Sequence, residues 1–206
     1  MVQLFRDRPV TFRPQVIETG AEWEMHSSLV STRWATPEIT FSKQLELHWG
    51  TNPLLLESHP GPSSCAIWAQ LPVEKIVFVG DAVVPGAPPF LANADLTAWK
   101  ITLDLLLKPE LKNYTIVSGR NGVVTTREVK DQLKQLERVE KQVEKRSGKP
   151  AHAEDLQKAS QNLLKHCDVP RGRETQYLMR LKYGLTRYLR RQTDIPLEQP
   201  ELPLPG

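Results

Sequence analysis

Residues 54–93 constrain the fold more than any other part of this 206-residue chain. Three short apolar runs within this stretch are typical of buried β-strands, at 54–56, 65–69 and 76–79. Turn residues follow each run, and at the ends of two of these strands stand polar side chains that could do chemistry, His59 and Asp81. Because a rigid strand fixes the position of the residues that follow it, these two side chains are the first candidates for a functional site.

Both turns resemble motifs of the metallo-β-lactamase superfamily. That family has a G-H-T-x-G-S turn with a metal-ligand histidine, followed by a hairpin whose second strand ends in G-D, and the aspartate bridges two metal ions. Residues 58–64 here read S-H-P-G-P-S-S, and residues 77–81 read V-F-V-G-D. The resemblance implies that His59 and Asp81 stand at metal-ligand positions of a hydrolase fold.

The rest of the family's ligand set is missing or altered. The family also uses an H-x-H-x-D-H run, and none of the five histidines here has another histidine two or five positions away. A later P-G-H-G turn supplies the last histidine of the family, and residues 118–122 read S-G-R-N-G instead. The resemblance therefore implies that Arg120 substitutes for a metal ligand.

Two interpretations of Asp81 remain open. Asp81 is structural and pairs with Arg120, or Asp81 and His59 still hold a metal with help from elsewhere. Two ligands do not hold a catalytic metal tightly, and a permanent guanidinium beside Asp81 would oppose a second metal ion. A site that binds zinc, iron or manganese and a site that binds no metal are equally compatible with the sequence.

If Asp81 and His59 still hold a metal, the missing ligands have several conceivable sources. His48 and Cys65 follow or precede the relevant strands, but packing or surface roles suit each of them better. A second copy, a partner chain or a segment upstream of Met1 would also supply them. The corresponding function is an active metal-dependent hydrolase completed by ligands outside this chain.

The expected fold class is α/β, an α+β sandwich of the αββα type that the resemblance implies. A P-x-I-T-F segment at 37–41 and an L-x-L strand at 45–47 extend the match. The second half of the sandwich is complete and the first half is reduced or missing. We expect a partial metallo-β-lactamase-like domain over residues 1–150, a helical extension packed on it over 151–192 and a Pro-rich tail over 193–206.

An incomplete sandwich leaves one face of a sheet in water, and a large exposed apolar surface marks an interface. Either the first 36 residues form a reduced first half, or another protein covers the sheet. We therefore expect a homo-oligomer or a partner chain.

Helix signals follow the central stretch. Asp95 is the predicted cap of a helix with Leu96, Trp99, Leu103 and Leu106 on one face. Thr125 and Glu128 form a capping-box signature, and two further helices are expected near 153–166 and 174–191.

Basic residues concentrate near the end of the chain, which favours a third function, a nucleic-acid-binding module on the same scaffold. Residues 127–191 hold seventeen Lys and Arg against nine Asp and Glu. Solvated helix faces and packing explain most of this charge equally well. The concentrated group is Arg171, Arg173, Arg180, Lys182, Arg187, Arg190 and Arg191.

Composition sets outer limits on these alternatives. Apolar residues make up 39% and charged residues 25% of the chain, and the net charge of +3 demands no polyanionic partner. No apolar run approaches the ~20 residues of a membrane span, and no secretory signal is visible. The two cysteines, Cys65 and Cys167, form no disulfide framework, and Cys65 is expected in the core. A cytoplasmic protein is the expectation.

Overall fold

The computed structural model describes residues 39–146 and 152–192. The predicted reduced first half, within residues 1–36, and the predicted tail over 193–206 lie outside the described residues. Within the described residues, no helix has the length and apolar content needed to cross a membrane.

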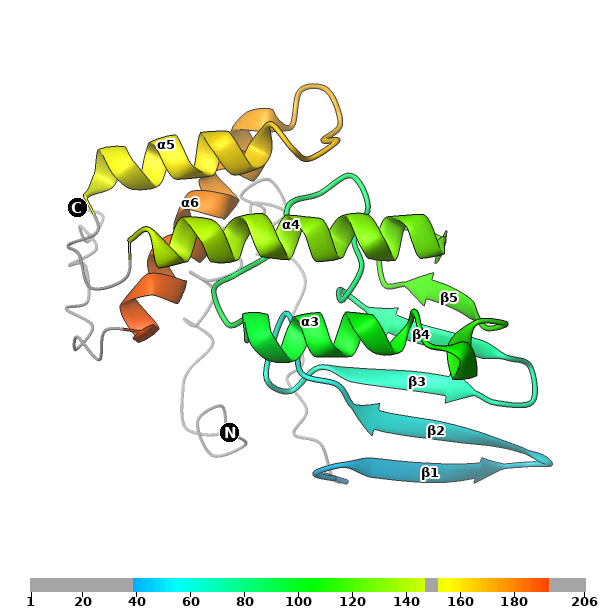
Figure 1. Ribbon diagram of the computed structural model, residues 1–206. Helices are drawn as coiled ribbons and strands as arrows, with labels where there is room; N and C mark the ends of the chain where they lie inside the picture. Colours follow the sequence, from blue (N-terminus) through cyan, green and yellow to red (C-terminus); the bar gives the residue numbers. More distant parts are fainter. Residues whose placement is uncertain (1–38, 147–151, 193–206) are drawn as a thin grey trace, which may run out of the picture.

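A six-stranded sheet organises the described part of the chain (Figure 1). Its strands follow one another in sequence order from β1 to β6, and every neighbouring pair is antiparallel except β4 and β5, which run parallel. The strands are β1 (Gln44–Trp49), β2 (Asn52–Ser58), β3 (Ile67–Leu71), β4 (Ile76–Gly80), β5 (Thr115–Ser118) and β6 (Gly122–Val124).

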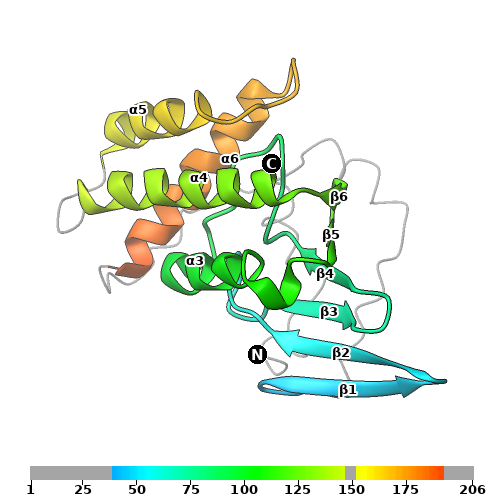
Figure 2. The same cartoon turned by 45° about the vertical axis from the view of Figure 1, so that its right-hand side comes forward.

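Two helices cover one face of this sheet (Figures 1 and 2). The helix α3 (Leu96–Leu105) lies in the connection between the parallel strands β4 and β5, as a parallel pair requires, and the short 3-10 helix η1 (Pro109–Leu111) follows it. The helix α4 (Thr126–Glu144) lies beside α3, and α5 (Ala153–Leu164) and α6 (Glu174–Gln192) pack beyond it.

The predicted helix starts are confirmed. The side chain of Asp95 accepts a hydrogen bond from the backbone N–H of Ala98 at 2.9 Å. Thr125 and Glu128 form both halves of the capping box at the start of α4. These caps are local in sequence, so the residue pattern alone predicts them.

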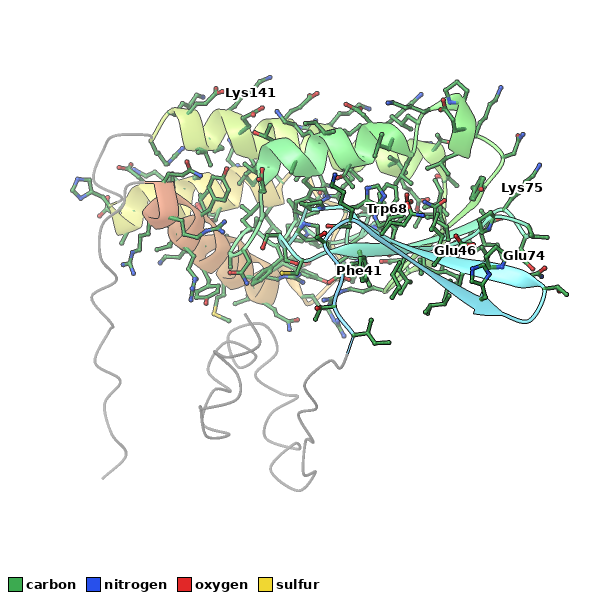
Figure 3. All side chains as sticks on the ribbon, turned by 90° about the horizontal axis from the view of Figure 1, so that it is seen from below. Phe41, Glu46, Trp68, Glu74, Lys75 and Lys141 are labelled. Atoms are coloured by element: carbon green, nitrogen blue, oxygen red, sulfur yellow. The ribbon has the colours of Figure 1, made fainter. Side chains whose placement is uncertain are left out.

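The core lies between the sheet and the helices. Figure 3 shows Trp68 of β3 between the two layers, and this side chain is fully buried. The predicted apolar face of α3, which is Leu96, Trp99, Leu103 and Leu106, is buried throughout. Leu163 of α5 and Leu185 of α6 belong to the same apolar cluster.

The expectation that Cys65 is a buried strand residue is wrong. The strand begins two residues later, at Ile67, and Cys65 lies exposed in a turn. The backbone N–H of Ala66 closes this turn by donating to the carbonyl of Ser63 at 3.3 Å. A short apolar run predicts a strand but does not fix where the preceding turn ends.

The opposite face of the sheet is apolar and partly exposed. The register aligns its positions across the sheet, and the side chains of Ile67, Phe78 and Val123 are 46%, 42% and 67% exposed. We call this surface the open face. It consists of Leu45, Leu47, Leu54, Leu56, Ile67, Ala69, Leu71, Ile76, Phe78, Thr115, Val117 and Val123.

Candidate functional site

The sheet topology brings three predicted site residues to one edge. Strands β2 and β4 both run antiparallel to β3, and β5 runs parallel to β4, so β2, β4 and β5 end at the same side. His59 follows β2, Asp81 follows β4, and Arg120 follows β5. Neighbouring strands are ~4.8 Å apart, so His59 and Asp81 stem from strand ends ~10 Å apart, while Asp81 and Arg120 stem from adjacent strands.

Arg120 binds both carboxylate oxygens of Asp81. Its Nε lies 3.0 Å from Oδ1 and 3.1 Å from Oδ2, and its Nη2 lies 2.7 Å from Oδ2. The hydrogen bond to Asp81 raises the pKa of Arg120 above its ordinary value, although partial burial acts against this. The sequence-based expectation that the two residues pair is therefore confirmed.

Two glycines set the backbone of this pair. Gly80 has a φ of 56°, a left-handed conformation that glycine adopts without a steric penalty, and it turns the chain at the end of β4. The N–H of Gly119 donates to the carbonyl of Gly80 at 2.8 Å. A Cβ at Gly119 would lie 3.2 Å from the carbonyl carbon of Gly80, so a side chain there would force the neighbouring backbone to shift by a few tenths of an ångström.

Further hydrogen bonds join the two loops that carry the pair. The hydroxyl of Ser118 donates to the carbonyl of Val83 at 2.6 Å. The side-chain amide of Asn121 donates to the carbonyl of Pro85 at 3.1 Å. Because these bonds tie the loop after β5 to the loop after β4, Arg120 is held beside Asp81 by the backbone as well as by charge.

His59 has other partners. Its ring lies over the ring of Trp68 with 4.0 Å between centroids, and its Nε2 lies 3.5 Å from Oε2 of Glu57. The same carboxylate of Glu57 accepts a hydrogen bond from the side-chain amide of Gln70. The structure brings Asp81 and Arg120 together but does not bring His59 into contact with either.

The two conceivable helper ligands do not join the site. His48 lies on β1 opposite Pro53, at the other end of β2 from His59, and its nearest acidic group is Glu46 at 3.6 Å. Cys65 is exposed in the turn before β3. Within residues 39–146 and 152–192, no group of three or more His, Cys, Asp or Glu side chains is placed to hold a metal ion.

These residues do not fit a catalytic metal centre. Such a centre takes about three protein ligands and an open position. Here the carboxylate of Asp81 is engaged by a guanidinium and the imidazole of His59 packs on an indole. A hydrolytic step through a bound metal cannot be derived from this arrangement.

The basic side chains of α6 are used partly within the chain. The guanidinium of Arg187 lies over the ring of Tyr183, and that of Arg191 over the ring of Tyr188, with 5.8 and 5.6 Å to the ring centroids. Arg191 also donates to the carbonyl of Ala94 at 2.7 Å. The two ring contacts lie within α6, and the bond to Ala94 joins α6 to the segment before α3.

Two polar residues near Asp81 were not singled out as a site by the sequence. Gln132 of α4 is 4% exposed, and Arg180 of α6 is half-buried. Gln132 interrupts the apolar stripe of α4, three residues after Val129 and four before Leu136, and this interruption is the signal that the sequence offers. No sequence signal separates Arg180 from its basic neighbours.

A comparison with a solved structure shows the fold. No protein-family model and no curated protein matches the sequence. A metallo-β-lactamase family protein from Thermus thermophilus is similar in structure, with a TM-score of 0.51 and 16% identity over 87% of this chain and 61% of that one. The described part of the chain thus has the metallo-β-lactamase fold.

Two other solved structures are similar with lower TM-scores. A metallo-β-lactamase from Pontibacter korlensis has a TM-score of 0.45 and 21% identity over 55% of this chain and 54% of that one. A metallo-β-lactamase superfamily protein from Sulfolobus tokodaii has a TM-score of 0.48 and 14% identity over 86% of this chain and 63% of that one. The chain spans less than two thirds of the length of each of the three proteins.

Proposed function

We propose that this chain is a hydrolase-like protein of the metallo-β-lactamase fold with an incomplete metal site, and that it is non-catalytic or only weakly active. The observation that carries the proposal is the two-point contact of Arg120 with Asp81. A bidentate guanidinium–carboxylate contact is a geometrically specific pair, and it occupies the oxygens that a metal would need.

Electrostatics acts in the same direction. Two unit charges 4 Å apart interact with about 4 kcal/mol at an effective dielectric constant of ~20, so a dication near Arg120 would meet a repulsion of about 8 kcal/mol. The Asp81 and Arg120 side chains are 39% and 54% exposed, so water reduces this figure considerably. A site with one carboxylate already neutralised by its own cation has little left to attract a metal.

The surroundings of His59 add to the argument. Its ring is packed on Trp68, and its side chain is only 16% exposed. Moving this imidazole up to the carboxylate of Asp81 would break the ring contact with Trp68 and leave Glu57 without its histidine neighbour. The proposal therefore gives His59 a structural role at the end of β2.

Metal content of the protein purified without chelator tests the proposal. We expect far less than one zinc, iron or manganese ion per chain, and the same content in H59A and D81A. One or two ions per chain, lost in both variants, would instead support the active hydrolase whose further ligands come from outside this chain. D131A is the matched control for D81A, because Asp131 also faces basic side chains, Arg127 at 3.9 Å and Lys134 at 3.1 Å, on the exposed side of α4.

The proposal includes association of two copies through the open face. Every position of the open face is uncharged, so two copies can meet there without like-charge repulsion. Contiguous exposed apolar surface of this kind marks interaction sites. The partly exposed side chains of Phe78 and Val123 would then be buried between the copies.

Light scattering coupled to size exclusion tests the association. We expect a dimer for the natural chain and a monomer for F78E. I101E is the matched control, because Ile101 is also exposed, at 60%, but belongs to α3 on the other side of the sheet. A monomer at every concentration would contradict association of two copies and leave another segment or another protein as the cover.

A further inference from the structure

The helix α6 and the loop before it carry a positive charge that the proposed function does not use. Residues 169–192 hold seven Lys and Arg and one acidic residue, Glu174. This stretch has an excess of six positive charges, whereas the whole chain has a net charge of +3, so the remaining residues together are net acidic. A surface with one sign of charge attracts ligands of the opposite sign.

The charges of α6 are arranged differently from those of α4, a helix of the same length. On α4, Asp131 lies 3.9 Å from Arg127 and 3.1 Å from Lys134, so acidic and basic side chains alternate on its exposed side. On α6, Arg187 is followed four positions later by Arg191, and no acidic residue stands three or four positions from Arg187. Like charges at this spacing destabilise a helix. A balanced solvated surface therefore describes α4 but not α6.

Three arginines of α6 form a row, which we call the arginine row: Arg180, Arg187 and Arg191. They stand seven and four positions apart, so they share one side of the helix and extend about 16 Å along its axis. Both ends of the row contact the segment between β4 and α3. The guanidinium of Arg180 lies over the ring of Phe90, and Arg191 donates to the carbonyl of Ala94 at 2.7 Å.

Aromatic rings restrict the side chains of the arginine row. Each guanidinium lies over one ring, with distances to the ring centroid of 5.0 Å for Arg180 and Phe90, 5.8 Å for Arg187 and Tyr183, and 5.6 Å for Arg191 and Tyr188. A guanidinium has five N–H donors at its edge, and a ring contact uses only its face. Arginines held in this way lose less conformational freedom when they bind an anion.

The arginine row has no counter-charge in the part of the chain that the structure describes. None of the ion pairs between described residues includes one of its three members. Arg120 lies near one end of the row, since burial and then the positive charge of Arg120 lower the pKa of Arg180. The nearby carboxylate of Asp81 is already bound by Arg120. An anion from outside these residues would therefore neutralise the row.

The shape and chemistry of the arginine row favour one class of anion. A small anion meets one or two of its charges, whereas a chain of phosphates meets all three. A single strand can follow a straight row, whereas the two backbones of a B-form duplex lie on either side of a groove about 12 Å wide. Six of the seven basic residues in 169–192 are arginines, the residue type preferred for phosphate and nucleic-acid recognition.

We propose that the arginine row binds the phosphate backbone of a single-stranded nucleic acid, irrespective of its base sequence. Contacts to phosphates position a nucleic acid without reading its bases. The rings beside the row already carry guanidinium groups on their faces, so stacking of bases contributes little. The inference does not rest on the proposed function, because no residue of the row stands at a metal-ligand position.

Fluorescence anisotropy with a labelled oligothymidylate of about 20 nucleotides tests the site, with a chelator present throughout. We expect saturable binding whose logarithmic salt dependence has a slope of about −2, because each of three phosphates contributes about −0.7. The double variant R187Q with R191Q should bind at least tenfold more weakly, with a slope near −0.7. R127Q with K134Q is the matched control, because it removes the same charge from α4 and should bind as the natural chain does.

Four results would overturn the inference. The first is an absence of saturable binding at about 50 mM salt, where phosphate contacts are strong. The second is an equal loss of affinity in the two double variants, which would leave only an effect of net charge. Tighter binding of a duplex of the same length would replace the single strand. Polyglutamate that competes as well as unlabelled oligothymidylate would make an acidic protein the partner.

Arginine footprinting on the natural chain gives a second test that does not depend on how the variants fold. Phenylglyoxal modifies accessible arginines, and mass spectrometry measures each site. Oligothymidylate should protect Arg187 and Arg191 and leave Arg127, whose side chain is 91% exposed on α4, as reactive as before. The same reactivity of Arg187 and Arg191 with and without oligothymidylate would contradict the inference.

Discussion

The indole Nε1 of Trp99 donates a hydrogen bond to the backbone carbonyl of Ala82 at 3.0 Å, and both residues are buried. This bond joins the middle of α3 to the residue directly after Asp81. The turn at Gly61 packs on the five-membered ring of the same indole, because a Cβ there would lie 3.0 Å from Cδ1 of Trp99. Trp99 thus fixes the loops after β2 and β4 at once.

Trp99→Phe should destabilise the protein by about 1–3 kcal/mol, because the buried carbonyl of Ala82 loses its donor. Chemical denaturation measures this change in the free energy of unfolding. Ile101→Ala on the exposed side of the same helix is the control and should change it by less than about 0.5 kcal/mol. Equal effects of the two substitutions would show that the hydrogen bond does not fix the loop.

Some parts of this structure follow from the sequence because their causes are local. The caps at Asp95 and Thr125 depend on residues three positions away, and both are present as predicted. The Asp81–Arg120 pair is not local, but the resemblance aligned the two turns that carry it. Cys65 shows the limit of a local pattern, because it lies in the turn closed by the Ala66–Ser63 hydrogen bond and β3 begins only at Ile67.

Other parts depend on tertiary packing that the sequence does not reveal. The run at 54–56 predicts a buried strand, yet the residues of β2 are only half-buried because one face of the sheet is uncovered within the described part of the chain. Gln132 and Arg180 belong to different helices and become neighbours only where both meet the loop after β4. Their proximity could not be read from spacing.

Gly119→Ala should displace Arg120 from Asp81. The added Cβ would lie 3.2 Å from the backbone carbon of Gly80 and 3.4 Å from Oδ1 of Asp81, so the Gly80 backbone and the Asp81 carboxylate would have to shift by a few tenths of an ångström. Overpacking of this kind typically costs 1–3 kcal/mol. Chemical denaturation gives the energy and a crystal structure gives the Arg120 position; an unchanged ion pair in a stable protein would contradict the close-approach argument.

Cys167 should resist alkylation much more than Cys65. Burial raises the pKa of the Cys167 thiol to about 11, so at pH 8 only about one thiol in a thousand is the reactive thiolate. Its reactivity should rise with pH up to about 11, because deprotonation follows that pKa. Mass spectrometry after iodoacetamide treatment measures both sites, with C65S to isolate Cys167. Rapid labelling of Cys167 at pH 8 would contradict its burial beside Leu163.

The zinc affinity of the natural chain, compared with that of Arg120→His, tests the central claim most directly. Competition with a chromophoric chelator measures both. The account predicts no specific zinc binding by the natural chain and a gain of at least tenfold in R120H, because the substitution frees Asp81 and adds an imidazole beside it. Tight stoichiometric zinc binding by the natural chain, lost in D81A and unchanged in R120H, would contradict it.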